Sequence, residues 1–124
     1  MYRNMKRSEE TEQMTLVDWC NINVFKYPEL KLLYHIPNGG RRNKLEAARL
    51  KRAGVKKGVP DLCLPVARGK FYGMYIELKY GKGKTSKEQK EWIKDLKEQG
   101  YNAVVCYGFE EAKKAIIDYL SRGV

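Results

Sequence analysis

The centre of the chain reads Gly58-Val59-Pro60-Asp61-Leu62-Cys63-Leu64 and, after a short glycine-containing connection, Met74-Tyr75-Ile76-Glu77-Leu78-Lys79. Both runs are too apolar for loops and too short for helices, so we expect two neighbouring buried strands. Side chains alternate between the two faces of a strand, which places Glu77 and Lys79 side by side on one face. Asp61 reaches the same place if the two strands pair.

Helices and one further strand are expected on either side of these two strands. A first helix runs from about Ser8 to Val24, since Ser8 can cap it and acidic residues fill its first turn. A short extended piece then leads to the turn Pro37-Asn38-Gly39-Gly40. Later segments read as a basic helix (44–53), a helix from Thr85 or Ser86 to Gly100, a strand (102–107) and a helix (109–120). The pattern predicts one α/β domain over residues 1–124, in which helices flank a small mixed β-sheet.

The charge of the chain points to a polyanionic partner. Twenty-five Lys and Arg against fifteen Asp and Glu leave a formal net charge of +10, and residues 38–57 hold eight cations and one acid. Nucleic acid is the partner that such a concentration of charge suggests, although many small proteins are basic only for solubility. Three distant cysteines indicate neither a disulfide framework nor a zinc site, and no stretch approaches the length of a membrane span. We therefore expect a reducing, cytoplasmic compartment.

Asp61, Glu77 and Lys79 suit hydrolysis of a phosphodiester. Mg²⁺ and Mn²⁺ prefer oxygen ligands and keep several waters, so two carboxylates and a backbone carbonyl, such as that of Leu78, are enough. Lys79 can orient the attacking water or stabilise the charge on the phosphate. The alternative is an ordinary salt bridge at a strand end. Pro-Asp at the start of one apolar strand followed by Glu-x-Lys in the next favours the nuclease.

The motifs taken together resemble the VRR-NUC branch of the PD-(D/E)xK nuclease superfamily. The resemblance is carried by Gly58 to Leu62, Ile76 to Lys79, Ser86 to Gln89, Gly100-Tyr101, and His35 to Arg42, in this order along the chain. It implies a restriction-endonuclease-like sandwich and a metal-dependent, structure-selective DNA nuclease. Stand-alone members of this small, phage-like type are thought to act as dimers on four-way junctions, which implies a homodimer here.

Site residues follow from the resemblance position by position. Asp61 and Glu77 match the metal-binding acids, Lys79 the catalytic lysine, and Gln89 a glutamine that supports the site from the next helix. An acid of the first helix also belongs to the pattern; Glu12 fits best, and Glu9 and Glu10 remain open. Simple compensation of the helix dipole explains each of these three acids equally well.

Phosphate contacts are expected from two basic segments, 41–57 and 82–87, and from the glycine-containing turn just before the first of them. The lone histidine, His35, is assigned to phosphate contact or loop support, not to zinc, because no second soft ligand has suitable spacing. The remaining expected DNA-binding residues are Asn38, Gly39, Gly40, Arg41, Arg42, Arg49, Arg52, Lys56, Lys57, Lys82, Lys84 and Lys87. These residues show no base-reading pattern, so binding is expected to depend on DNA shape and to fall steeply with salt.

The sequence thus predicts a Mg²⁺- or Mn²⁺-dependent endonuclease that hydrolyses phosphodiesters in branched DNA such as four-way (Holliday) junctions. It is expected to work in the cytosol of a bacterial host or of a phage-infected cell. Two alternatives stay open: a non-catalytic basic DNA-binding module, and a nuclease that acts on other DNA or RNA structures.

Overall fold

The computed structural model describes residues 6–37 and 43–123. Its elements are α1 (Glu9–Ile22), the 3-10 helix η1 (Pro28–Leu32), β1 (Tyr34–His35), α2 (Lys44–Arg52), β2 (Leu62–Leu64), β3 (Met74–Lys79), α3 (Lys87–Glu98), β4 (Asn102–Tyr107) and α4 (Gly108–Leu120). The expected α/β fold with a mixed sheet is confirmed. The sequence did not indicate η1, a 3-10 helix that starts at Pro28.

The sheet has four strands in the order β1-β2-β3-β4. β1, β2 and β3 pair antiparallel, whereas β4 pairs parallel to β3, with Ile76 opposite both Leu62 of β2 and Val104 of β4. Two parallel strands need a crossover, and α3 supplies it. The predicted pairing of the two central strands is therefore correct, and it brings the position of Asp61 next to that of Glu77.

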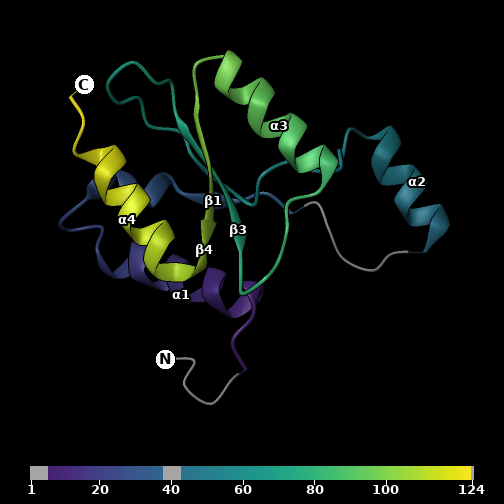
Figure 1. The fold of residues 1–124 in the computed structure, drawn as a ribbon, viewed down its shortest axis with the longest axis horizontal. Helices are drawn as coiled ribbons and strands as arrows, with labels where there is room; N and C mark the ends of the chain where they lie inside the picture. The colour runs from purple at the N-terminus through teal and green to yellow at the C-terminus, as the bar shows by residue number, and fades with distance from the viewer. Residues whose placement is uncertain (1–5, 38–42, 124) are drawn as a thin grey trace.

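The hydrophobic core lies between the sheet and the helices α1 and α4, which lie side by side (Figure 1). Leu16 and Cys20 of α1 and Ile116 of α4 meet Ile76 and Leu78 of β3 there, each at most 1 % exposed. Period-two alternation sends the other side chains of β3 to the opposite face. Glu77 and Lys79 are on that opposite face, yet they are buried too, being 1 % and 7 % exposed.

Side-chain caps start the helices where the sequence indicates. Ser8 accepts a hydrogen bond from the backbone of Thr11, and Ser86 does the same for Gln89, so each serine satisfies a backbone N–H group that the first turn leaves unpaired. Gly58 ties α3 to the segment before β2, because a Cβ atom there would lie 2.7 Å from the backbone carbon of Glu88. This close approach, at a positive φ of 92°, sets the start of α3 beside the chain that leads into Asp61.

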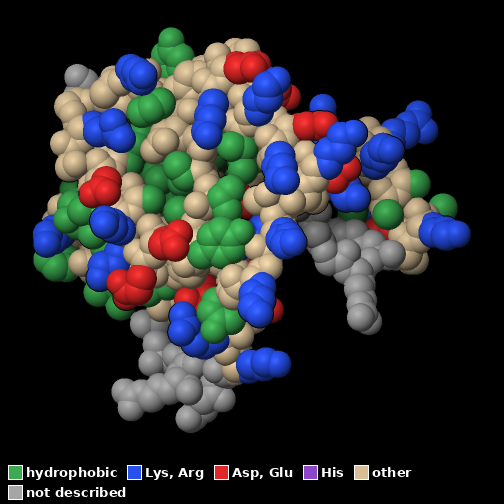
Figure 2. Space-filling model, viewed as in Figure 1, with side chains coloured by type: hydrophobic (Ala, Val, Ile, Leu, Met, Phe, Trp, Pro, Cys, Tyr) green, Lys and Arg blue, Asp and Glu red, His purple; other side chains and the backbone are tan. Residues whose placement is uncertain are grey.

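The helix α2 projects from the rest of the molecule (Figure 1). It has no buried residue, and its last turn carries Arg49, Lys51 and Arg52. Many Lys and Arg side chains are spread over α2 and α3 in the space-filling view (Figure 2). No helix among residues 6–37 and 43–123 is long and apolar enough to cross a membrane.

Candidate active site

The site lies where the start of β2 meets the end of β3: Asp61 directly precedes β2, and Glu77 and Lys79 are among the last three residues of β3. The Asp61 carboxylate accepts a hydrogen bond of 2.7 Å from the backbone N–H of Leu78, which fixes its side chain against β3. Lys79 Nζ lies 3.5 Å from Glu77 Oε2. The structure therefore brings together the three side chains that the sequence predicted to converge.

Glu77 occupies the innermost position of this group. Its Oε2 accepts a hydrogen bond of 3.1 Å from the Gln89 side-chain amide and faces Lys79, whereas its buried Oε1 has no hydrogen-bond partner among the described residues. A buried carboxylate oxygen without a partner costs free energy unless something positive approaches it. Glu77 therefore fits one ligand position of a cation.

The pKa of Glu77 reflects the same arrangement. Burial raises it from its ordinary value of 4.5 to about 8, and the nearby Asp61 carboxylate adds to the shift, while Lys79 opposes it. Two neighbouring carboxyl groups disfavour each other's ionisation, and a bound divalent cation would offset the repulsion between their negative charges. Carboxylate oxygens are hard ligands, so the chemistry of this pair fits a divalent cation that retains several waters.

Gln89 links the site to α3. Its side-chain oxygen accepts from the backbone N–H of Ser86 at 2.8 Å as part of the helix cap, and its side-chain nitrogen donates to Glu77. One residue therefore starts the helix and holds one oxygen of the buried acid. That it supports catalysis, as the sequence suggested, stays a prediction.

A hollow of about 410 Å³ opens beside Asp61. Its lining residues are Glu9, Glu10, Gln13, Met14, His35, Asp61 and Leu78. His35 Nδ1 lies 2.8 Å from the carbonyl oxygen of Asp61, so the lone histidine reaches the backbone of the site. The first helix thus contributes acids to this hollow, and they are Glu9 and Glu10.

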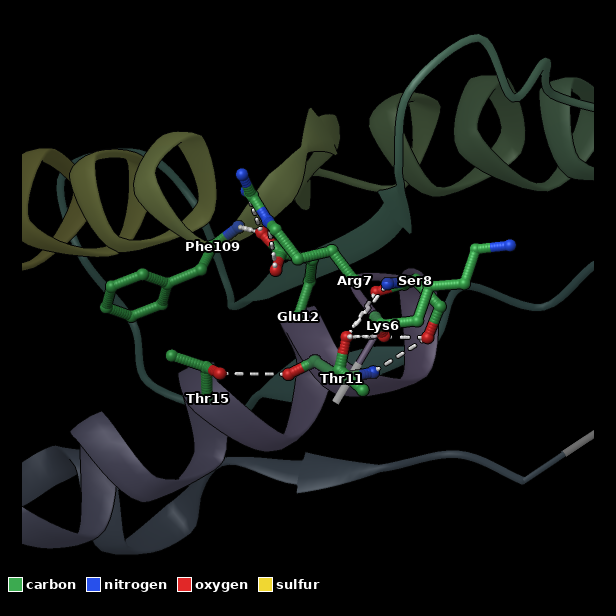
Figure 3. A network of polar contacts seen from close by, with 7 residues as sticks. All are labelled: Lys6, Arg7, Ser8, Thr11, Glu12, Thr15 and Phe109. Carbon is green, nitrogen blue, oxygen red and sulfur yellow. Dashed lines mark hydrogen bonds and ion pairs between the residues drawn. The ribbon is translucent and has the colours of Figure 1, made fainter. Parts of the chain in front are cut away.

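Glu12, the first-helix acid preferred from the sequence, is placed elsewhere, and that preference is wrong. Its carboxylate accepts hydrogen bonds from the guanidinium of Arg7, at 2.9 and 3.2 Å, and from the backbone N–H of Phe109 at 3.1 Å (Figure 3). Both oxygens are thus occupied at the start of α4, and the Arg7 hydrogen bonds lower the pKa of Glu12. Glu12 has a structural role: it caps α4 and joins it to α1.

Across residues 6–37 and 43–123, no three acidic, histidine or cysteine side chains converge closely enough to form a metal cluster by themselves. The three-carboxylate set of Glu12, Asp61 and Glu77 is therefore not formed. The pair of Asp61 and Glu77 remains, and two carboxylates suffice for a cation that retains its waters.

The expected DNA-binding residues form two groups, those that the structure describes and those outside the described residues. Asn38, Gly39, Gly40, Arg41 and Arg42 belong to the second group. The side chains of Arg49, Arg52, Lys56, Lys57, Lys82, Lys84 and Lys87 are all exposed. Lys57 lies 3.9 Å from Glu88 at the start of α3, which joins the basic segment loosely to the helix that carries Gln89.

Two comparisons with known proteins agree with one another. The family model described as the VRR-NUC domain matches residues 7–110. A solved structure titled "VRR_NUC domain protein" is similar over 96 % of this chain and 93 % of its own, with 35 % sequence identity and a TM-score of 0.83. No curated protein matches the chain.

Replacing Glu12 by Gln tests its structural role. We expect Glu12→Gln to lower the free energy of unfolding by about 1–3 kcal/mol, because α4 loses its charged cap. The lowered pKa of Glu12 means that this contribution is present above the unfolded pKa, near 4.5, and is lost as the pH falls through the folded pKa. Denaturant unfolding at several pH values measures both effects.

Glu9→Gln and Glu10→Gln are the matched controls, since both acids are exposed on the same helix. Each is expected to change stability by less than about 0.5 kcal/mol. The structural role of Glu12 is refuted if Glu12→Gln leaves the free energy of unfolding unchanged and abolishes the increase in melting temperature that Mn²⁺ causes.

The raised pKa of Glu77 predicts that metal stabilises the protein in a pH-dependent way. Because this pKa is higher in the folded state, Glu77 contributes its full stabilisation of the fold below pH 4.5, and this contribution is lost as the pH rises through about 8. Without metal, the melting temperature should therefore fall more between pH 5 and 8 in the wild type than in Glu77→Gln. Mn²⁺ should restore stability at pH 8 more than at pH 5, because protons compete with the cation for the carboxylate. Equal melting curves for the two proteins, with and without Mn²⁺, would contradict this assignment.

Proposed function

This chain belongs to the VRR-NUC family, a family of nuclease-type DNA-processing domains, and on that premise we propose that it is a Mg²⁺- or Mn²⁺-dependent endonuclease that cuts branched DNA such as four-way junctions. One observation carries the metal-dependent part: Glu77 is buried beside Asp61 and Lys79 with one carboxylate oxygen left without a partner among the described residues. A salt bridge between Glu77 and Lys79 does not occupy this oxygen, whereas a cation bound beside Asp61 would.

Each residue of the site then has one task. Asp61 and Glu77, with the carbonyl of Leu78, would hold the cation. Gln89 keeps Glu77 Oε2 occupied, so that Oε1 is the oxygen left to bind it. When bound, the cation supplies an acidified water and neutralises charge on the phosphate.

Lys79 and the acids of α1 complete the assignment. The Lys79 ammonium, buried at the strand end, stabilises negative charge on the phosphate oxygens where little water screens it. Glu9 and Glu10 line the hollow beside Asp61, where an acid can orient the attacking water. His35 supports the Asp61 backbone through its contact with the carbonyl oxygen.

The DNA lies, in this proposal, across the exposed cations. Arg49 and Arg52 on α2, with Lys56 and Lys57, form one arm, and Lys82, Lys84 and Lys87 form the other. Because α2 projects from the body of the molecule, the two arms can contact separate duplexes of a branched substrate (Figure 1). Contacts of this kind bind phosphates without reading bases, so selectivity comes from DNA shape.

The proposed compartment is the cytosol of a bacterial host or of a phage-infected cell. Its support is the three cysteines, Cys20, Cys63 and Cys106, all buried and free. Free thiols persist in a reducing environment.

A homodimer is the proposed assembly. Among the described residues β4 pairs only with β3 and so forms an edge of the sheet, and hydrophobic side chains gather over it between α3 and α4 (Figure 2). A groove of about 390 Å³ at this place includes Ile93 of α3 and Val105 of β4 in its lining. Native proteins usually cover an apolar edge, and a second copy that docks here would place two sites on one branched duplex.

Cleavage assays test the function directly. Labelled four-way junctions, flaps and plain duplexes should be cut in Mg²⁺ or Mn²⁺ and left intact in EDTA, with branched DNA preferred. Asp61→Ala should lower the rate by at least about 100-fold, the scale of losing an essential electrostatic group. DNA binding of this variant should be unchanged or stronger, because a negative charge near phosphate is removed.

Glu91→Gln is the control for these assays, because Glu91 is an exposed acid on α3 away from the site. It should cut at the wild-type rate. No cleavage of any DNA in either metal would refute the proposal and favour a non-catalytic DNA-binding module, whereas cleavage of RNA alone would favour another substrate.

Light scattering tests the assembly. We expect the mass of a dimer for the wild type and of a monomer for Ile93→Lys, because a charge in the apolar groove would have to be desolvated on docking. Leu45→Lys is the matched control, since Leu45 is 84 % exposed on α2. A dimeric Ile93→Lys, or a monomeric wild type, would rule out this interface.

A further inference from the structure

Tyr107 is an aromatic residue beside Lys79 that the proposed chemistry does not use. It is the last residue of β4, and the parallel register places it directly opposite Lys79 at the end of β3. Register partners on adjacent strands present their side chains to the same face of a sheet. Tyr107 nevertheless remains 42 % exposed, whereas Lys79 is buried.

Hydrogen bonds hold Tyr107 at both ends. Its hydroxyl donates to the carbonyl oxygen of Gly83 at 2.9 Å, and its backbone N–H donates to the carboxylate of Glu111 at 2.9 Å. A side chain already held in one orientation loses little entropy when a ligand packs on it. Tyr107 is therefore a partly exposed aromatic side chain that is already held in one orientation.

The loop that Tyr107 holds lies over the candidate site. A Cβ atom at Gly83 would lie 3.4 Å from Glu9 Oε2 and 3.6 Å from Lys79 Cδ, so Gly83 packs between α1 and the lysine. Lys82 and Lys84 flank Gly83 in the sequence, and both are exposed. One corner of the molecule thus combines a fixed aromatic ring, two exposed ammonium groups and the buried Lys79.

We propose that Tyr107 forms a nucleobase subsite: its ring stacks on an unpaired base next to the phosphate that enters at Lys79, while Lys82 and Lys84 contact the flanking phosphates. The inference rests on the proposed function, because a branch point is where duplex DNA presents unpaired or unstacked bases. Aromatic side chains combined with cations are the usual means of binding single-stranded nucleic acid without reading its sequence. The subsite would help the enzyme to select branched over continuous duplex DNA.

Binding of a flapped DNA with and without one base tests the subsite. The affinity of the wild type is measured in EDTA for a flap with adenine, and for the same flap with an abasic residue, at the first unpaired position. We expect roughly tenfold tighter binding of the adenine form, the scale of one base stacked on an aromatic ring. Tyr107→Phe should keep this ratio, because the ring remains, and Tyr107→Leu should reduce it to about one.

The control is Tyr72→Leu, since Tyr72 is a 69 % exposed tyrosine that packs on Tyr101 and lies against Gly100, beyond the end of α3. It should keep the wild-type ratio. The ratio compares two DNAs on the same protein, so a change in folding or in oligomeric state cancels from it.

Three results would overturn the subsite: no preference of the wild type for the adenine form, a preserved ratio in Tyr107→Leu, or equal loss in Tyr107→Phe and Tyr107→Leu. The last result would assign Tyr107 to holding the loop through its hydroxyl. Because binding is measured without metal, the subsite and the nuclease proposal can fail separately. A protein that never cuts DNA can still show the ratio, and an active nuclease can lack it.

Discussion

Glu77 carries a carboxylate that is almost entirely removed from water, in a strand that also forms the centre of the sheet. Such a group is costly unless each oxygen meets a donor or a positive charge. Lys79 and Gln89 satisfy Oε2, while Oε1 has no partner among the described residues and Asp61 adds a second negative charge nearby. The elements around β3 can be understood as the means of holding this unfavourable group in place.

The supports come from helices that are distant in the sequence. Gln89 is positioned by the cap at Ser86, and the start of α3 is in turn held against Gly58, just ahead of Asp61. On the other side, Glu12 joins α1 to the start of α4. Arg7, its partner, lies 5.0 Å from the centre of the Tyr80 ring, one residue beyond Lys79. Both the buried acid and the lysine are therefore held by packing as well as by the strand itself, which favours a rigid site over a mobile one.

Local patterns in the sequence predicted much of this correctly. The alternation along β3 placed Glu77 and Lys79 on one face, and the serine caps marked the starts of α1 and α3. The same patterns did not distinguish Glu9, Glu10 and Glu12, because all three suit the first turn of a helix equally well. Only the packing of α1 against α4 shows that Glu12 turns toward Phe109, while Glu9 and Glu10 line the hollow beside Asp61.

The sequence by itself determined most of the secondary structure, the pairing of the two central strands and the excess of positive charge, because these depend on composition and on spacing between near neighbours. The tertiary structure alone decided that Glu77 and Lys79 are both buried, that one oxygen of Glu77 is left without a partner among the described residues, and that Tyr107 lies opposite Lys79. Burial and register across β3 and β4 arise from the crossover through α3 and from helices packed on both sides. Such contacts join residues far apart in the chain, and no local pattern encodes them.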